Sequence, residues 1–169
     1  MQKIDKETIL SRRVTNARSN KEGLLCLSDT VLVDADLDAV FEQTRELTLR
    51  ELDLTNNLLT DEGVRKVKLF CISHPTIKTL ILNNNGAMTD ASAIELLNVT
   101  TITDLQLWKN IRIKNPFAHA ISQQQHLTKL DIRETGIDQE LILKAHAHVR
   151  KFAQEHISDD STESLPRYA

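Results

Sequence analysis

Cysteine and histidine side chains are the groups of this sequence that can act as nucleophiles, bases or metal ligands, and the chain has two cysteines and six histidines. A catalytic thiol needs a histidine base and a group that orients it, but no histidine falls in the repeated positions around Cys26. His146 and His148 form the one close pair, and residues two apart on a helix point to different sides. We therefore predict no catalytic residue, no metal site and no cofactor. An enzyme that uses the Cys26 thiol stays open as an alternative.

A second kind of chemistry, recognition without catalysis, is indicated by one aromatic residue. Trp108 is the only tryptophan of the chain, and Arg133 occupies the equivalent position one repeat later. Tryptophan and arginine dominate the energetics of protein interfaces. An arginine here can stack on the indole or form a bidentate ion pair with a carboxylate. This pair is the predicted anchor of a protein-binding surface.

Trp108 and Arg133 belong to a sequence motif that recurs along the chain, Leu-x-Leu-x-x-Asn. Its first leucine is Leu25, Leu52, Leu80, Leu105 and Leu130 in successive units, 25 to 28 residues apart. The Leu-x-Leu pair alternates with period two, which predicts a short strand with its leucines inward. One unit alone buries too little apolar surface to be stable, so we expect the units to stack and their strands to form a parallel sheet. The asparagines, replaced by Thr30 and Thr135 in the end units, are expected to satisfy backbone groups in the turn.

The second half of each unit shows helical spacing of apolar residues. We expect helices to begin near Asp34, at Thr60 or Asp61, and at Thr89 or Asp90. Asn115 is predicted to cap a helix that has Pro116 at its first position. The fourth and fifth units have the shorter period, so their helices are expected to be short or partly 3₁₀.

The repeated phrase resembles that of leucine-rich-repeat proteins over five units, from about residue 23 to 157. The segments Leu59-Thr60-Asp61-Glu62-Gly63-Val64 and Met88-Thr89-Asp90-Ala91 resemble the helix entry of ribonuclease-inhibitor-type and GALA-type repeats. The resemblance implies an α/β solenoid of about five β-α units. Its short parallel sheet is expected on the concave face, and its helices on the convex face.

Side chains that flank the strand leucines are predicted to form a concave strip roughly 20–25 Å long. The candidate protein-binding residues on it are Glu51, Asp53, Ile81, Asn83, Asp104, Gln106, Trp108, Lys109, Lys129, Asp131 and Arg133. Carboxylates dominate the strip, with a basic flank near its C-terminal end. Its size is close to one side of a standard protein interface.

Composition narrows the classes of partner. The net charge is −3 and aromatic residues are 4% of the chain, which argues against nucleic-acid binding. No apolar run is long enough to span a membrane, and two unpaired cysteines are typical of a reducing cytoplasm. We expect a monomer with an N-terminal helical cap over residues 1–20, a repeat domain over residues 21–157, and a disordered tail over residues 158–169.

The predicted function is that of a non-catalytic module that binds a protein through the concave strip. The chain also resembles small leucine-rich-repeat effectors of intracellular bacteria such as Legionella, and its polar tail resembles signals for type IV secretion. This resemblance implies translocation into a host cell and a partner that is a host protein or another effector, such as an enzyme that binding inhibits or regulates. A substrate adaptor for a ubiquitin ligase is the alternative.

Overall fold

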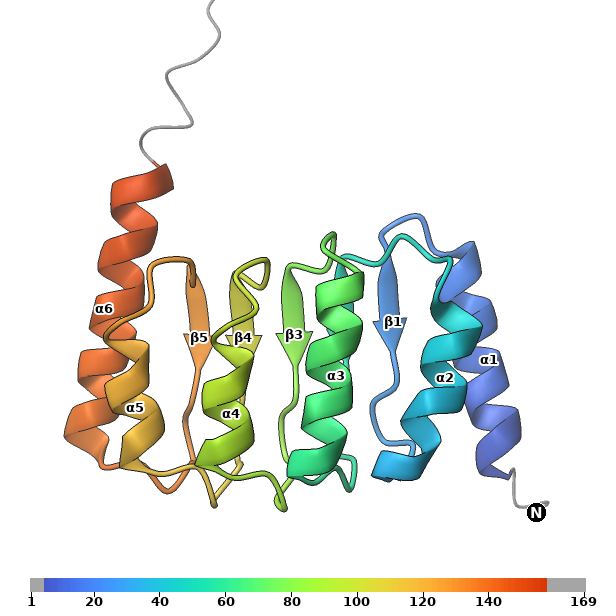
Figure 1. Ribbon diagram of the computed structural model, residues 1–169, viewed down its shortest axis with the longest axis horizontal. Helices are drawn as coiled ribbons and strands as arrows, with labels where there is room; N and C mark the ends of the chain where they lie inside the picture. The colour runs from blue at the N-terminus through green and yellow to red at the C-terminus, as the bar shows by residue number, and fades with distance from the viewer. Residues whose placement is uncertain (1–4, 158–169) are drawn as a thin grey trace, which may run out of the picture.

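The computed structural model describes residues 5–157 as alternating short strands and helices (Figure 1). The elements are α1 (Lys6–Ser19), β1 (Leu24–Cys26), the 3₁₀ helix η1 (Asp34–Asp36), α2 (Leu37–Thr44), β2 (Glu51–Asp53), α3 (Asp61–Ser73), β3 (Thr79–Ile81), α4 (Asp90–Leu96), β4 (Asp104–Gln106), α5 (Asn115–Ile121), β5 (Lys129–Asp131) and α6 (Gln139–Ile157). The tail predicted over residues 158–169 lies outside the described residues. Among the helices of residues 5–157, none is long and apolar enough to cross a membrane.

The strands form one parallel sheet in the order β1-β2-β3-β4-β5. Its register aligns the first leucine of every unit, so that each one is the direct partner of the next, in the order Leu25, Leu52, Leu80, Leu105 and Leu130. The central leucine is buried in β1 to β4 while its two neighbours are half-buried. The predicted α/β solenoid fold of five repeated units is confirmed.

The helices lie on one side of the sheet. Figure 1 shows α2 to α5 in front of the strands, with α1 and α6 at the two ends. The core between the layers joins strand leucines to helix residues such as Val64, Val67 and Phe117, all at most 1% exposed. The opposite side, predicted to be the concave face, carries the side chains that flank the leucines. We call this side the open face.

The asparagine column is buried where each strand turns toward its helix, as predicted. Asn57 is 3% exposed. Its Nδ2 donates to the carbonyl oxygens of Leu27 and Leu54, both at 2.9 Å, and its Oδ1 accepts from the Leu32 N–H at 2.9 Å. One amide therefore satisfies backbone groups of its own unit and of the preceding one.

The first-unit helical segment begins at Asp34, as predicted, and the caps of α3 and α4 also agree with the prediction, whereas that of α5 differs. The Thr60 and Thr89 hydroxyls cap α3 and α4 by accepting from the N–H groups of Glu62 and Ala91. The prediction for Asn115 was wrong, because the helix begins at this residue and the preceding Lys114 provides no side-chain cap. In its place the Asp90 carboxylate of the previous unit accepts from the Lys114 N–H at 2.8 Å.

Helix lengths also depart from the prediction in part. The fourth-unit helix α5 is short, with 7 residues, as expected. The fifth-unit helix α6 has 19 residues, and the 3₁₀ turn occurs in the first unit instead.

Candidate functional site

All the predicted strip positions lie on or beside the open face. Glu51 and Asp53 come from β2, Ile81 from β3, Asp104 and Gln106 from β4, and Lys129 and Asp131 from β5. Asn83, Trp108, Lys109 and Arg133 follow directly after these strands. The register places Glu51, Thr79, Asp104 and Lys129 in one row, and Asp53, Ile81, Gln106 and Asp131 in the next. The sheet therefore brings together residues that are far apart in sequence.

Trp108 is half-buried at the exit of β4. Its backbone is fixed on both sides, because its N–H donates to Asn83 Oδ1 at 2.8 Å and its carbonyl accepts from the Asn84 N–H at 2.8 Å. Lys109 Nζ lies 5.6 Å from the indole centroid, within the range of a cation–π contact. Hydrogen bonds to Asn83 and Asn84 thus hold the backbone of Trp108.

Arg133 forms the bidentate ion pair that the sequence allowed, and the carboxylate comes from its own unit. Its Nε lies 2.9 Å from Asp131 Oδ1, and its Nη2 lies 2.6 Å from Asp131 Oδ2. These hydrogen bonds hold the pKa of Asp131 below its ordinary value. The cation over the tryptophan is Lys109, so the stacking alternative for Arg133 is not realised.

Three carboxylates occupy the middle of the open face. Glu51 and Asp53 form no ion pair with a lysine or arginine among residues 5–157, and Asp104 has only Lys129 at 3.7 Å. Burial raises the pKa of Glu51, and the nearby charges of Asp53 and Asp104 raise it further. Negative charge is therefore concentrated here, and Lys129 compensates part of it, because its charge acts on both Asp104 and Glu51.

The two cysteines differ in surroundings. Cys26 is half-buried on the open face, and its Sγ has Arg13 Nη1 at 3.6 Å, Ser28 Oγ at 3.2 Å and Asp53 Oδ2 at 3.8 Å. In the described part of the chain, no histidine is among these neighbours, so Cys26 lacks the base of a cysteine–histidine pair. Cys71 is a fully buried residue of the core, and burial raises the pKa of its thiol to about 12.

The histidines do not gather into a metal site. Over residues 5–157, no group of three or more histidine, cysteine, aspartate or glutamate side chains is placed to hold a metal ion. His148 Nε2 lies 2.7 Å from the Gln124 carbonyl oxygen, whereas the Nε2 atoms of His126 and His146 are buried with no hydrogen-bond partner. Burial lowers the pKa of both His126 and His146, which favours neutral rings.

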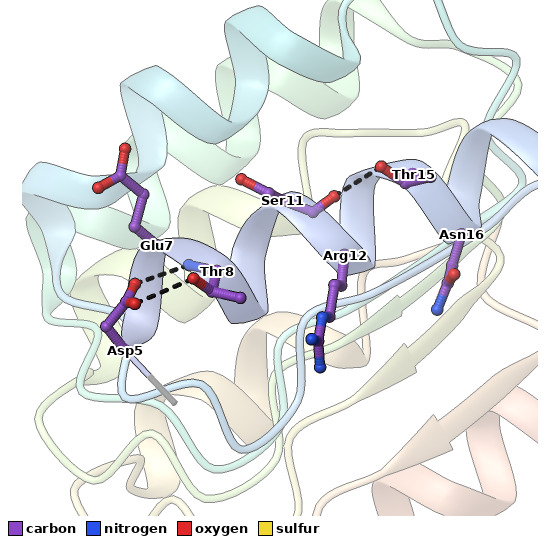
Figure 2. Close-up of a pocket in the computed structure, with 7 residues that line it drawn as sticks. All are labelled: Asp5, Glu7, Thr8, Ser11, Arg12, Thr15 and Asn16. Atoms are coloured by element: carbon purple, nitrogen blue, oxygen red, sulfur yellow. Dashed lines mark hydrogen bonds between the residues drawn. The ribbon is translucent and has the colours of Figure 1, made fainter. Parts of the chain in front are cut away.

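A hollow of about 580 Å³ lies along α1 (Figure 2). Its wall consists of polar side chains of this helix and of its N-cap, Asp5. The Asp5 carboxylate accepts from the N–H and the hydroxyl of Thr8, both at 2.9 Å, and these bonds lower its pKa. Glu7 and Arg12 point away from each other. The hollow therefore contains no paired acid and base, and we assign no site to it.

Two sets of residues that support the open face were not predicted in these roles. The first follows the strands, where the chain turns with positive φ. Its members are Asp29, Asn56, Asn84, Lys109 and Glu134, with φ of 57°, 55°, 52°, 62° and 53°. Their repeat-wide spacing was visible in the sequence, but the left-handed backbone was not. Asn84 Nδ2 donates to Asn56 Oδ1, and Asn56 Nδ2 donates to Asp29 Oδ1, both at 2.8 Å.

The second set links the helix entries. The Asp34 carboxylate accepts from the Thr60 N–H at 3.0 Å and from its hydroxyl at 2.6 Å. Asp61 repeats this arrangement with Thr89 at 2.7 and 2.8 Å. Gly63 leaves room for it, because a Cβ there would lie 2.1 Å from Asp34 Oδ1. The recurring Thr-Asp pair signalled a helix cap, while its aspartate serves the next unit.

Comparisons with known proteins agree with this architecture. The family model described as "Leucine Rich repeat" matches residues 47–68, and no curated protein sequence matches the chain. A solved structure of the leiomodin-1 actin-binding site 2 is similar, with a TM-score of 0.67 and 14% sequence identity. The match covers 96% of this chain and 100% of the leiomodin-1 chain. Together with the five aligned strands, these matches support a leucine-rich-repeat fold for the chain.

Proposed function

We propose that this protein is a non-catalytic module that binds a protein partner through the open face, with Trp108 as an anchor. The observation that carries the proposal is a partly accessible tryptophan on a backbone held by hydrogen bonds. The backbone of Trp108 is bonded to Asn83 and Asn84, and its half-buried side chain lies beside Lys109. A backbone that is ordered before binding loses little conformational entropy in the complex.

The surroundings of Trp108 support the same use. Within β2 to β4 the flanking positions carry polar or charged side chains and Ile81, none of which enters the core between sheet and helices. The scaffold beneath is held by buried asparagines. Binding residues presented on rigid elements are typical of repeat proteins, which use an extended face for recognition.

The structural neighbour supports the class of partner. The similar leiomodin-1 structure is that of an actin-binding site, so a fold of this kind is used there to bind a protein. At 14% identity the likeness concerns the fold, and we draw from it only a protein as the partner class.

The resemblance to small bacterial effectors suggests a more specific form of the proposal. In this form the protein is a monomer that acts in the cytoplasm, including that of a host cell after translocation. Its partner is a host protein or another effector, and binding inhibits or regulates an enzyme. The test is a comparison of the partner's activity with and without a stoichiometric amount of this protein.

The central experiment compares Trp108→Ala with a matched substitution on the helix side. The protein is immobilised, a partner is captured from cell extract, and affinity is measured by calorimetry with the purified partner. We expect Trp108→Ala to weaken binding by about 2 kcal/mol or more. Leu69→Ala removes an apolar side chain that is 65% exposed on α3, and we expect it to leave the affinity unchanged. Equal affinities for native protein and Trp108→Ala would remove Trp108 from the interface.

A further inference from the structure

The two ends of the sheet are covered to different extents. At the N-terminal end, α1 packs against β1, its residues Val14 and Ala17 are buried, and the strand leucine Leu25 is 0% exposed. At the C-terminal end, the equivalent leucine of β5, Leu130, is only half-buried. This end of the sheet is therefore the less covered one, and we call the outer side of β5 the free edge.

Main-chain donors on the free edge are unused. In the fourth unit, Leu107 and Lys109 donate their N–H groups to carbonyl oxygens of the β5 segment, at 2.7 and 3.0 Å, and the equivalent bonds recur between all earlier units. Ile132 and Glu134 hold these two positions in the last unit, and within residues 5–157 their N–H groups have no acceptor. The last unit therefore carries two free donors at the positions through which every other unit bonds its successor.

A main-chain acceptor on the same edge is also unused. The Thr103 carbonyl accepts from the Lys129 N–H at 3.0 Å, and this bond too recurs between earlier units. Its equivalent in the last unit is the Thr128 carbonyl, which accepts from no group in the described part of the chain. A sheet edge with unpaired main-chain groups can bind a further strand.

The surface beside the free edge is apolar and bordered by cations. A hollow of about 250 Å³ is lined by residues of the β5 segment and of α6, namely Thr128, Lys129, Leu130, His146, Val149 and Arg150. Leu130 and Val149 supply its apolar wall. The Lys129 side chain is 75% exposed and lies 3.7 Å from Asp104, while Arg150 is exposed and forms no ion pair within residues 5–157. The charges that border the hollow therefore favour an acidic ligand.

We infer that the free edge binds an extended segment of a protein partner, which joins the sheet as a sixth parallel strand. The register of the sheet, repeated once more, places an apolar residue of this segment on Leu130 and Val149. The residue before it faces Lys129 and donates its N–H to the Thr128 carbonyl. An acidic side chain suits this position, because opposite charges on neighbouring strands attract each other. The inference goes beyond the proposed function, because Trp108 takes no part in it.

The chain's own C-terminal sequence suits the free edge less well. Leu130 follows the end of α5 by nine residues, and Leu165 follows the end of α6 by eight. Leu165 is therefore the leucine at repeat spacing, and the next residue is Pro166. A strand in this register needs an N–H at that position, which proline lacks. We therefore assign the free edge to a partner.

An eight-residue peptide tests the inference on the full chain. It has two leucines in the spacing Leu-x-Leu, a glutamate before the first of them, and threonine or serine elsewhere, and both ends are blocked. Amide resonances and amide exchange are followed by NMR during titration. We expect shifts in β5 and α6, together with slower exchange of the Ile132 and Glu134 N–H groups.

Two methylated peptides form the matched pair that tests the hydrogen bonds. A methyl group on the glutamate nitrogen removes the donor to the Thr128 carbonyl, and we expect about tenfold weaker binding. A methyl group on the nitrogen of the first leucine removes an N–H that points away from β5, so the affinity is expected to change by less than about twofold.

Two charge-matched variants test the cations. We expect Lys129→Gln with Arg150→Gln to weaken binding of the peptide about fivefold. Lys144→Gln with Lys151→Gln removes two other exposed cations of α6, and binding is expected to persist. Thermal transitions of both variants confirm that they fold.

Several results would overturn the inference. They are no binding, equal effects of the two methyl groups, equal weakening by the two variants, or binding that appears only after residues 158–169 are removed. A dimer in sedimentation whose formation protects the Ile132 and Glu134 N–H groups would assign the free edge to a second copy instead. Failure here is distinguishable from failure of the proposed function, because Trp108→Ala is expected to bind the peptide like the native protein.

Discussion

The buried asparagine column and the open face both recur in every unit, a few residues apart. Their polar groups differ, because the buried amides are hydrogen-bonded within the chain, whereas some carboxylates of the open face form no ion pair within residues 5–157. Asn57, Asn85 and Asn110 are at most 3% exposed, and their amides bond backbone groups of two successive units. On the open face, Glu51 and Asp53 are only half-buried, and they form no ion pair with a lysine or arginine in the part of the chain that the structure describes.

This contrast distinguishes residues that stabilise the fold, in the asparagine column, from residues that can bind a partner, on the open face. A buried amide without partners would cost about 1–3 kcal/mol per lost bond, so the asparagine column keeps one residue type in its interior units. The open face varies from unit to unit, and its side chains are free to meet a partner. Repetition indicates the residues that hold the fold, while departures from it indicate those that select what binds.

The largest effect is expected from removing one amide of the asparagine column. Asn85 is fully buried, its Nδ2 donates to the carbonyl oxygens of Leu54 and Leu82 at 3.0 and 3.1 Å, and its Oδ1 accepts from the Leu59 N–H at 3.3 Å. Asn85→Ala leaves these groups unpaired, so we expect a loss of about 3 kcal/mol in the free energy of unfolding. Urea denaturation followed by circular dichroism measures it.

The matched control for Asn85→Ala is Asn98→Ala, at an exposed position just after α4. We expect a change within about 0.5 kcal/mol. If Asn85→Ala and Asn98→Ala lowered the free energy of unfolding by similar amounts, the asparagine column would not be what stabilises the fold.

An intermediate effect is expected at the helix entries, where Asp61 links two units. Its carboxylate accepts from Thr89 and from the Ser92 hydroxyl at 2.6 Å. Burial opposes the charge, but the hydrogen bonds of Ser92 and Thr89 prevail and lower the pKa of Asp61 from its ordinary 3.8. We expect Asp61→Asn to lower stability at pH 7 by about 1 kcal/mol.

The pH dependence gives this prediction a definite sign. A carboxyl whose pKa is lower in the folded state stabilises the protein above its unfolded pKa and loses that contribution as the pH falls. The difference between native protein and Asp61→Asn should therefore shrink below about pH 4. Asp38→Asn on α2 is the control, because the Asp38 side chain is exposed and its ion pair with Lys66 is screened by solvent. A difference that stays constant from pH 7 to pH 3 contradicts the assignment.

Much of the fold was predictable because every unit must bury the same strand leucines against its neighbours. The alignment of Leu25, Leu52, Leu80, Leu105 and Leu130 follows from their near-constant spacing, and the sheet register confirms it. The turn asparagines were predictable for the same reason. The pairing of Asp131 with Arg133 follows from two residues on the same side of a strand.

Contacts between units were harder to predict, since they depend on how one unit sits on the next. Asp90 precedes a helix of its own unit, yet its carboxylate accepts from the N–H of Lys114 in the following unit. The sequence therefore favoured Asn115 as the cap, and only the stacked structure shows the actual donor. Lys109 likewise lies over Trp108 because its backbone turns with positive φ.

The smallest effect is expected at Glu51, a half-buried carboxylate of the open face. Its pKa is raised above the ordinary 4.5 by burial and by Asp53 and Asp104. The folded state therefore binds more protons than the unfolded state just above pH 4.5, and stability falls as the pH rises through that window. We expect Glu51→Gln to raise the free energy of unfolding at pH 7 by about 0.5 kcal/mol or less, with no difference at pH 3. Glu42→Gln should show no gain at pH 7. If Glu51→Gln lowered the stability, Glu51 would belong to the residues that stabilise the fold. If it raised the stability and weakened partner binding, the open face would carry a charge that favours binding at the expense of stability.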